Sequence, residues 1–372
     1  MDEILICEIC QNKDLKKVLD LGGHPLCDDL VYIGSNIVCK EYPICIVYCD
    51  NCKTAFQKFN VPKKELFSSS YHYRARMTGS VLSGMSDLVD EIEIFLGNMS
   101  NKFVIDIGCN DGSLLNFFKI KGCKTIGVEP TNAAKDSNHE TIQEFFDTDL
   151  ATKIVSKYGR PDIITFTNVF AHIENLPELL KAVKCLMHDK TCLAIENHYL
   201  GAVLEYGQFD TFYHEHPRTY SMESFKFIAT SLGKKLSFVQ FASRYGGNIR
   251  AFISHKKPTF KRVDEDNFLE KLSILNDHMK SWVFETKHKI YKLVDKYGKL
   301  RAKAFPGRAA ILIKLLGLTE DHISAVYEIK GSIKVNHYVP GTRIPILPEK
   351  KLYLEKDTSL PILNLAWHLP SE

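Results

Sequence analysis

The segment from Lys102 to Pro130, KFVIDIGCNDGSLLNFFKIKGCKTIGVEP, constrains the fold more than any other part of the chain. It begins with an apolar run over residues 103–107, which predicts a buried strand. A glycine-containing turn follows, then the helical apolar spacing of residues 113–119, and then a second apolar run over residues 125–128. This order of strand, turn, helix and strand is a βαβ unit, so we expect a doubly wound α/β domain.

The turn of this unit carries residues that suit a nucleoside ligand. Gly108 and Gly112 let backbone N–H groups approach a ligand closely, and the start of the following helix favours electron-rich groups. Glu129 ends the second strand, where a carboxylate suits the two hydroxyls of a ribose. Asp106 and Asp111 would repel a bound pyrophosphate, but they suit the sulfonium and amino groups of S-adenosylmethionine.

The stretch Asp106–Gly112, DIGCNDG, resembles motif I of the class I methyltransferases, and this resemblance implies S-adenosylmethionine as the cofactor. A further apolar strand over residues 161–168 leads to a loop at the sheet edge where doubly wound domains bind ligands. A ligand-free turn that only packs the βαβ unit is the alternative. The expected cofactor-binding residues are Asp106, Gly108, Asn110, Asp111, Gly112, Glu129 and Asn168.

Length and composition narrow the class of protein. The 372 residues suffice for two or three domains, and 45% hydrophobic with 25% charged residues is typical of a soluble globular chain. A net charge of +3 gives no broad basic field, so we expect no nucleic-acid partner. We also expect no membrane insertion and a cytoplasmic location, because no apolar run has spanning length and residues 1–3 do not begin a secretion signal.

The cysteines predict a metal site. Eleven cysteines scattered along a chain of this size favour reduced thiols plus a metal over a disulfide framework. Two C-x-x-C pairs, at residues 7–10 and 49–52, can close a tetrahedral zinc site across a small β domain that includes residues 21–25 and 44–49. Unliganded turn cysteines are the alternative. A shell of four thiolates, Cys7, Cys10, Cys49 and Cys52, leaves no open position, so we expect a structural zinc.

The two knuckles, the stretch Asp20–Leu26 (DLGGHPL) and the stretch Tyr71–Tyr73 carry a wider resemblance. They resemble the zinc-containing sugar C-methyltransferases, which act on nucleotide-linked 4-keto deoxysugars, and the similarity continues at intervals to about residue 345. The fold class that we expect is therefore α/β: a zinc-binding β domain over residues 1–65, a Rossmann-like class I methyltransferase domain over 66–260, and a linking helix with a C-terminal Rossmann-like α/β domain over 261–372.

Titratable side chains concentrate in the stretch Phe209–Ser221, FDTFYHEHPRTYS. Four of them stand in a row at residues 213–216. Burying four such side chains costs desolvation free energy, so their clustering favours a functional site over plain packing. Strand-like alternation would send residues 213 and 215 to one side and 214 and 216 to the other, whereas a turn would change that. A metal-free polar loop and a second metal site are the alternatives, but no third ligand for a second metal is evident.

The resemblance implies which of these residues face the reacting atoms. It places Tyr213, Glu215 and His216 in the active-site pocket, together with His172 and with Tyr73 of the Tyr-x-Tyr pattern. From the residues alone, a histidine at position 172 is as often a capping or core residue, and the two tyrosines before the following helix are more often surface packing.

The C-terminal third predicts a helix and a second nucleotide-binding unit. Residues 262–300 have a long helical period, which indicates a helix that crosses between domains or, as an alternative, a coiled coil. In the resembled family a Gly-x-Gly-Ala-x-Ala-Lys turn helps to bind the nucleotide, but residues 304–310 read AFPGRAA and lack its lysine. The candidate substrate-binding residues are Gly247, Asn248, Arg308 and Glu328, although a plain hairpin explains the first two equally well.

The chemistry that we expect is C-methylation beside a ketone. His216 would act as the base that removes a proton from carbon, and Glu215 would orient His216 or stabilise its charge. Tyr73, His172 and Tyr213 would donate hydrogen bonds to the enolate or sugar oxygens. Methylation of an oxygen is one alternative, and a decayed methyltransferase fold that only binds a partner is another. The sequence leaves open the sugar, the nucleotide and the oligomeric state, a monomer included.

Overall fold

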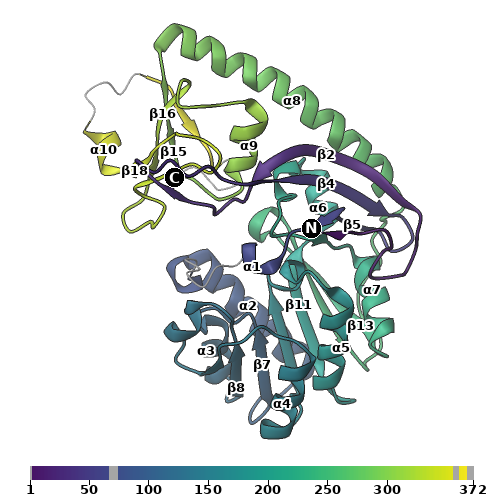
Figure 1. Cartoon of the computed structure of the whole chain (residues 1–372). Coiled ribbons are helices and arrows are strands. Elements are labelled where there is room, and N and C mark those ends of the chain that lie inside the picture. Colours follow the sequence, from purple (N-terminus) through teal and green to yellow (C-terminus); the bar gives the residue numbers. More distant parts are fainter. Residues whose placement is uncertain (1, 67–73, 355–359, 367–372) are drawn as a thin grey trace.

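The segment from Lys102 to Pro130 forms the centre of a seven-stranded sheet (Figure 1). The computed structural model describes residues 2–66, 74–354 and 360–366. The expected βαβ unit is present as β7, α3 (Ser113–Ile120) and the parallel strand β8. In spatial order the strands of this sheet are β13 (Lys235–Ala242), β14 (Asn248–Ser254), β11 (Cys192–His198), β10 (Ile163–Thr167), β7 (Phe103–Ile107), β8 (Lys124–Val128) and β9 (Glu140–Ile142).

The topology of this sheet places a ligand-binding edge at its centre. The five strands from β11 to β9 are parallel, and β14 pairs antiparallel with both β11 and β13. From β7 the chain first continues outward to β8 and β9, and then returns to the other side of β7 as β10. The carboxyl ends of β7 and β10 therefore meet at the switch point where doubly wound sheets bind ligands.

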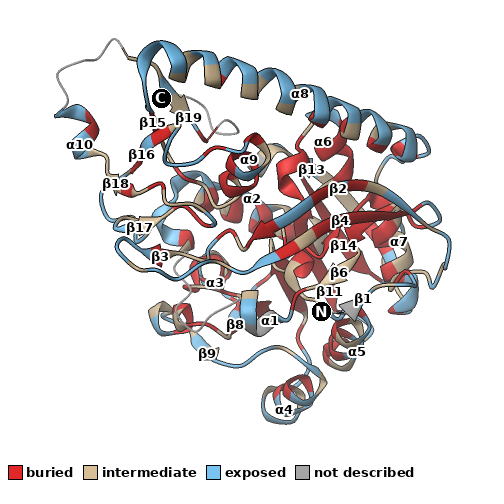
Figure 2. Cartoon of the chain, turned by 45° about the horizontal axis from the view of Figure 1, so that its top comes forward, coloured by how far each residue is buried: buried red, intermediate tan, exposed pale blue. Residues whose placement is uncertain are grey.

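Both faces of the sheet are covered, which explains why its strands read as continuous apolar runs. Ile105 and Ile107 of β7 pack into one core with α4, α5 and α7, whereas Val104 packs into a second core with α2 and α3. Figure 2 shows these central strands as buried. The covering helices are α2 (Gly79–Leu96), α4 (Thr148–Tyr158), α5 (Leu176–Leu186) and α7 (Met222–Ser231).

The N-terminal region forms the expected β structure, and it takes one strand from elsewhere in the chain. Its four-stranded antiparallel sheet has the order β12, β5, β4, β2. The strands are β2 (Leu15–Pro25), β4 (Glu41–Cys49), β5 (Thr54–Gln57) and β12 (Arg218–Thr219). Because β12 directly follows the stretch of titratable residues at 213–216, this sheet holds one end of that stretch.

A long helix, α8 (Phe268–Tyr297), crosses from the seven-stranded sheet to the C-terminal region (Figure 1). It is shorter at both ends than the expected span of 262–300. Before it, the carboxylate of Glu265 accepts hydrogen bonds from the first backbone N–H groups of α7, which holds these residues out of the helix. After it, Gly298 has a φ of +78° and ends the helix. The apolar stripe of α8 packs within this chain, against β2, α6 and α9.

The C-terminal region is a second α/β unit, with a parallel four-stranded sheet in the order β18, β16, β15, β19. Its first strand in the chain, β15, ends at Lys303, because Ala304 has a positive φ of 58° and breaks the extended backbone. The elements here are β15 (Leu300–Lys303), α9 (Ala309–Leu316), β16 (Ile323–Glu328), β17 (His337–Tyr338), β18 (Ile346–Pro348), α10 (Lys350–Tyr353) and β19 (Ile362–Asn364).

Short elements complete the described chain. They are β1 (Asp2–Glu3), β3 (Val31–Tyr32), β6 (Phe59–Asn60), α1 (Lys63–Leu66), α6 (Leu200–Glu205) and the 3-10 turns η1 (Ala75–Met77), η2 (Asn132–Asp136), η3 (Phe170–His172), η4 (Phe209–Thr211) and η5 (Arg244–Gly246). Among residues 2–66, 74–354 and 360–366, no helix combines the length and apolar character that crossing a bilayer requires.

Candidate active site and metal centre

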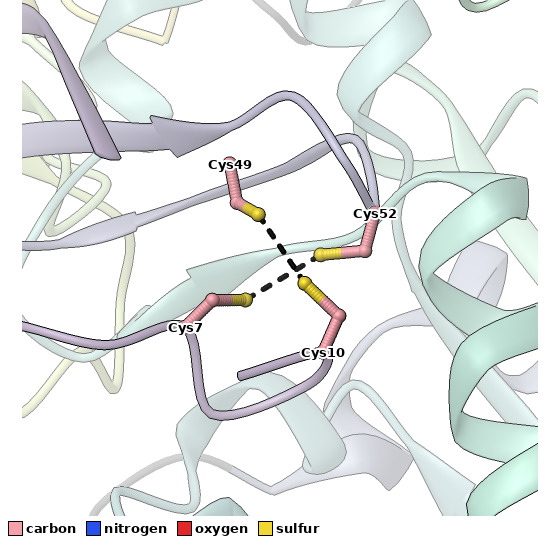
Figure 3. Close-up of side chains that lie close together, drawn as sticks. All are labelled: Cys7, Cys10, Cys49 and Cys52. Atoms are coloured by element: carbon pink, nitrogen blue, oxygen red, sulfur yellow. Dashed lines mark hydrogen bonds between the residues drawn. The ribbon is translucent and has the colours of Figure 1, made fainter. Parts of the chain in front are cut away.

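The four cysteines of the two knuckles converge on one point (Figure 3). Their sulfur atoms all lie within 4.8 Å of one another, with 3.5 Å between Cys7 and Cys52 and 3.4 Å between Cys10 and Cys49. A tetrahedral zinc site with Zn–S distances of about 2.3 Å has S–S edges of roughly 3.8 Å, so this cluster fits the metal. Four thiolates leave no position for a substrate, which makes the centre a structural one.

The metal centre is tied to the wall of the central sheet. The backbone carbonyl of Cys52 accepts a hydrogen bond from the hydroxyl of Ser224 in the first turn of α7, at 3.2 Å. Glu8, inside the first knuckle, pairs with the buried guanidinium of Arg218. Arg218 in turn donates to the carbonyl of Ile173 at 2.7 Å. The knuckle therefore supports the loop that follows His172.

A cavity of about 370 Å³ opens at the carboxyl ends of β7, β8, β10 and β11. Its lining combines the turn after β7 with the stretch that precedes β12, which lie more than one hundred residues apart in the sequence. The predicted site residues that line it are Asp106, Gly108, Asn110, Glu129, Asn168, His172, Tyr213, Glu215 and His216. Tyr73 lies outside the described residues.

Glu129 and Asp106 form the acidic side of this cavity. The carboxylate of Glu129 accepts the backbone N–H of Asn110 at 3.0 Å, and both the N–H and the hydroxyl of Thr131 at 2.9 and 2.6 Å. These bonds fix the carboxylate and leave lone pairs for further donors such as ribose hydroxyls. Burial raises the pKa of Asp106 to about 7, against a 2.7 Å hydrogen bond from Thr165 that lowers it.

Asp111 and Gly112 build the turn and do not line the cavity. One carboxylate oxygen of Asp111 accepts the N–H and the hydroxyl of Ser113, and the other accepts the backbone N–H of Arg76 at 3.0 Å. Gly112 has a φ of +75°, a conformation that favours glycine. Asp111 therefore joins the start of α3 to η1, the segment that supplies Ala75 to the cavity wall.

His216 is held by two hydrogen bonds in the opposite wall. Its Nδ1 lies 3.2 Å from the carbonyl oxygen of Thr211, and its Nε2 lies 3.2 Å from the hydroxyl of Tyr213. A carbonyl only accepts, so Nδ1 carries the proton and Nε2 presents its lone pair to the hydroxyl of Tyr213. Burial lowers the pKa of His216 well below its usual value, with His172 and His198 adding to the effect. The imidazole is therefore neutral near pH 7.

A turn, not strand alternation, sets the directions of residues 213–216. The backbone N–H of His216 donates to the carbonyl of Tyr213 at 2.9 Å, which brings both side chains to the cavity. His214 points to the N-terminal sheet instead, where its Nε2 lies 3.1 Å from the carbonyl of Tyr42. The alternating arrangement that the sequence left open is therefore wrong, and the turn is present.

Glu215 also lines the cavity, but it does not orient His216 through a hydrogen bond. In the described part of the chain, the partners of the His216 ring are Thr211 and Tyr213. The backbone carbonyl of Glu215 accepts from Nδ1 of His172, whose ring lies 4.8 Å from that of His216. Burial, together with the nearby charge of Asp28, raises the pKa of the Glu215 carboxyl to about 8, against the charge of Lys334, which lowers it.

The four candidate substrate-binding residues lie outside this cavity. The amide of Asn248 donates to Asn168 at 3.1 Å and to Glu196 at 3.0 Å, so it supports the cavity wall from behind. Gly247 packs so tightly that an added Cβ would lie 2.3 Å from the Cβ of Ala202. Arg308 forms an ion pair with Asp210, and Glu328 accepts the backbone N–H of Phe305.

Among the cavity residues that were not predicted are His198 and Arg244. His198 ends β11, and its ring lies 5.2 Å from that of His216. Arg244 precedes the paired glycines and forms an ion pair with the buried Glu196 at 3.0 Å. The signal that could have found His198 is the apolar run of residues 192–195 just before it, which indicates a buried strand with His198 near its carboxyl end. No comparable signal marked Arg244, whose approach to Glu196 depends on the β11–β14 pairing.

Three family models match successive parts of the chain. A zinc binding domain matches residues 7–67, a methyltransferase domain matches residues 74–235, and a C-methyltransferase C-terminal domain matches residues 243–372. The first contains all four cysteines of the cluster, and the second contains the βαβ unit that lines the cavity.

Known proteins show similarity of different extents. C-methyltransferase NovU from Streptomyces niveus is 28% identical over 253 residues, which are 67% of this chain and 60% of NovU. The chain thus spans well under two thirds of that relative. Among solved structures, magnesium protoporphyrin IX methyltransferase from Synechocystis is 15% identical, with a TM-score of 0.35 over 46% of this chain and 84% of that one. CalO1, a methyltransferase of calicheamicin biosynthesis, is 11% identical, with a TM-score of 0.35 over 47% and 55% of the two chains.

The family models and the site agree. The methyltransferase domain is of the kind that binds S-adenosylmethionine, and the zinc binding domain contains the cysteine cluster that fits zinc. The fold class is the expected one, an α/β Rossmann-like methyltransferase with an N-terminal zinc-binding β region and a C-terminal α/β unit. With all three models in one order along residues 7–372 of a single chain, the protein is similar to the zinc-containing C-methyltransferases in each of its parts.

Proposed function

We propose that this protein is an S-adenosylmethionine-dependent C-methyltransferase that methylates a carbon beside the ketone of a nucleotide-linked deoxysugar. One observation carries the proposal: a single cavity joins the acidic cofactor turn at Asp106 and Glu129 to the hydrogen-bonded pair of Tyr213 and His216. The cofactor supplies an electrophilic methyl group, so the protein has to supply a base and to stabilise the oxygen of the substrate.

His216 is the base in this proposal. Its neutral ring has the proton on Nδ1, held by Thr211, and the Nε2 lone pair beside the hydroxyl of Tyr213 in the cavity wall. Removal of a proton from carbon gives an enolate, whose oxygen needs hydrogen-bond donors. The pKa of Glu215 near 8 keeps its carboxyl largely protonated at pH 7, so Glu215 is proposed as the donor. The hydroxyl of Tyr213 can join it by turning away from His216, whereas the Nδ1 proton of His172 is already donated to the Glu215 carbonyl, so His172 would have to turn its ring to donate.

The sugar and its nucleotide are proposed from the family. The relative NovU is named a C-methyltransferase, and the C-terminal match bears the same name. A parallel sheet with a helix after its first strand, as in β15 and α9, is a frame on which nucleotides bind. We keep residues 1–65, 66–260 and 261–372 as the proposed zinc-binding, cofactor-binding and nucleotide-sugar-binding domains.

The test is methyl transfer to a panel of dTDP-, UDP- and GDP-linked ketosugars, after calorimetric titration of the protein with S-adenosylhomocysteine. With S-adenosylmethionine labelled by ¹³C in its methyl group, NMR of the product gives the position of the label. The proposal predicts a methyl group on a carbon next to the ketone. A methyl group on oxygen would establish the O-methyltransferase alternative, and cofactor binding without any product would support a binding module.

A further inference from the structure

An ion pair joins the C-terminal region to the wall of the proposed active site. Arg308, directly before α9, binds both carboxylate oxygens of Asp210, from Nε at 2.8 Å and from a terminal nitrogen at 2.6 Å. The side chains are 10% and 1% exposed, so the pair is almost completely removed from water. A two-point bond of this kind fixes orientation as well as distance.

Asp210 belongs to η4, and the next residue holds the proposed base. The carbonyl of Thr211 accepts from Nδ1 of His216 at 3.2 Å and from the backbone N–H of Tyr213 at 3.1 Å. The direction of this carbonyl therefore sets both the tautomer of His216 and the start of the turn over residues 213–216.

Aromatic packing holds the other side of η4. The ring of Phe209 lies 5.3 Å from that of Trp282 on α8, within an apolar cluster that also includes residues of α9. Packing of this kind keeps η4 in place but does not specify the rotation of one carbonyl, whereas a two-point bond to the neighbouring side chain does.

We propose that Arg308 is a positioning residue for the methyl-transfer site: through Asp210 it fixes the Thr211 carbonyl, which holds His216 with its proton on Nδ1 and its Nε2 lone pair beside Tyr213 in the cavity wall. The effect on rate rests on the proposed function, but the effect on the histidine does not. Arg308, which the sequence suggested as a substrate-binding residue, is in this proposal a residue that positions His216.

Arginine suits this role better than lysine would. Its planar fork matches a carboxylate at two points, whereas an ammonium group is a single point charge. The groups that face His216 from the neighbouring elements are His172 of η3, His198 of β11, Tyr213 and Arg308. Besides burial, the positive charge of Arg308 lowers the pKa of His216, so its removal raises that pKa.

The test is ¹⁵N NMR of the histidine side chains in the full-length protein, without a sugar substrate, for wild type, R308Q and R308K. H216N assigns the signal. Arg343 offers a matched control, because its guanidinium also joins the C-terminal region to another segment, at the carbonyls of Ser35 and Ile37. We expect His216 to be the Nδ1–H tautomer in wild type and in R343Q, and to populate both tautomers in R308Q and R308K. In R308Q its pKa also rises.

With the sugar that wild type methylates, we expect kcat of R308Q to fall by about tenfold to a hundredfold and KM to change little. The fall in kcat is part of the rate acceleration of ~10²–10⁴ that a positioned base contributes. The acidic limb of its pH profile moves to higher pH. An unchanged tautomer in R308Q, or the same loss in R343Q, would overturn the proposal. If R308Q does not fold, R308K decides by its tautomer. If wild type methylates no sugar, the proposed function fails while the NMR result still decides this inference.

Discussion

At the scale of single residues, burial determines which groups carry protons in the cavity. His216 is buried and neutral, while Asp106 and Glu215 have pKa values raised to about 7 and 8. The carboxylate of Glu129 is instead fixed by three hydrogen bonds from backbone and hydroxyl donors. Near pH 7 the ring of His216 is therefore neutral and the carboxyl of Glu215 is largely protonated, while hydrogen bonds set the orientation of the Glu129 side chain.

Glu129 tests the cofactor half of the site. In E129A the ribose loses a charged acceptor, and hydrogen bonds to charged groups contribute ~1.5–3 kcal/mol. We expect S-adenosylhomocysteine to bind about tenfold to a hundredfold more weakly. Calorimetric titration measures this change. E140Q, which alters a carboxylate on the edge strand β9 outside the cavity, is the control, and a similar loss in both variants would contradict the assignment.

The pH dependence of the free energy of unfolding tests whether Glu215 is protonated in the folded chain. Its carboxyl has a pKa of about 8 in the folded chain and an ordinary value of 4.5. Between these pH values the unfolded chain releases a proton that the folded chain keeps, so stability falls as the pH rises. E215Q removes this loss and should gain on the order of 4 kcal/mol relative to wild type from pH 5 to pH 9.

Thermal unfolding at both pH values measures this gain. E285Q on α8 changes an exposed glutamate and should show the same difference from wild type at pH 5 and pH 9. A gain in E215Q that does not depend on pH would show that the carboxyl is ionised in the folded chain.

At the scale of elements, the sequence predicted those helices, strands and turns whose structure depends on neighbouring residues in the chain. The βαβ unit followed from residues close together in sequence, and the four-cysteine site followed from two C-x-x-C pairs, each of which is local. The turn over 213–216 could not be predicted, because a row of polar residues fits a strand and a turn equally well. The early residues of the 262–300 span leave the helix because Glu265 caps α7, and the Arg308–Asp210 pair joins positions that only the tertiary fold brings together.

Removal of a zinc ligand tests whether the zinc centre supports the wall of the cavity. C49S removes a ligand from a closed thiolate shell, so we expect zinc content to fall from one equivalent to near zero and stability to fall by more than about 4 kcal/mol. Because the first knuckle reaches the wall at Ile173 through Glu8 and Arg218, cofactor binding should weaken as well.

Metal analysis, thermal unfolding and calorimetry with S-adenosylhomocysteine measure these three effects. C185S, in α5 and outside the cluster, is the control. A C49S protein that keeps both its zinc and its stability would contradict a four-cysteine structural centre.

At the scale of the whole molecule, the N-terminal region lies against both of the other regions (Figures 1 and 2). It takes β12 into its sheet, and β3 pairs with β17 of the C-terminal region. Arg308 reaches the active-site wall from the C-terminal side. The Arg308–Asp210 pair therefore couples the position of the C-terminal region to η4 and, through the carbonyl of Thr211, to the ring of His216.

Exchange of solvent deuterium into the carbon next to the ketone tests the central claim, that this cavity makes a carbon nucleophile. The sugar that the enzyme methylates is incubated in D₂O with enzyme and S-adenosylhomocysteine, which holds the cofactor site but cannot donate a methyl group. We predict exchange at that carbon with wild type and a loss of about 10²-fold or more with H216N. Exchange by H216N at the wild-type rate would contradict the account.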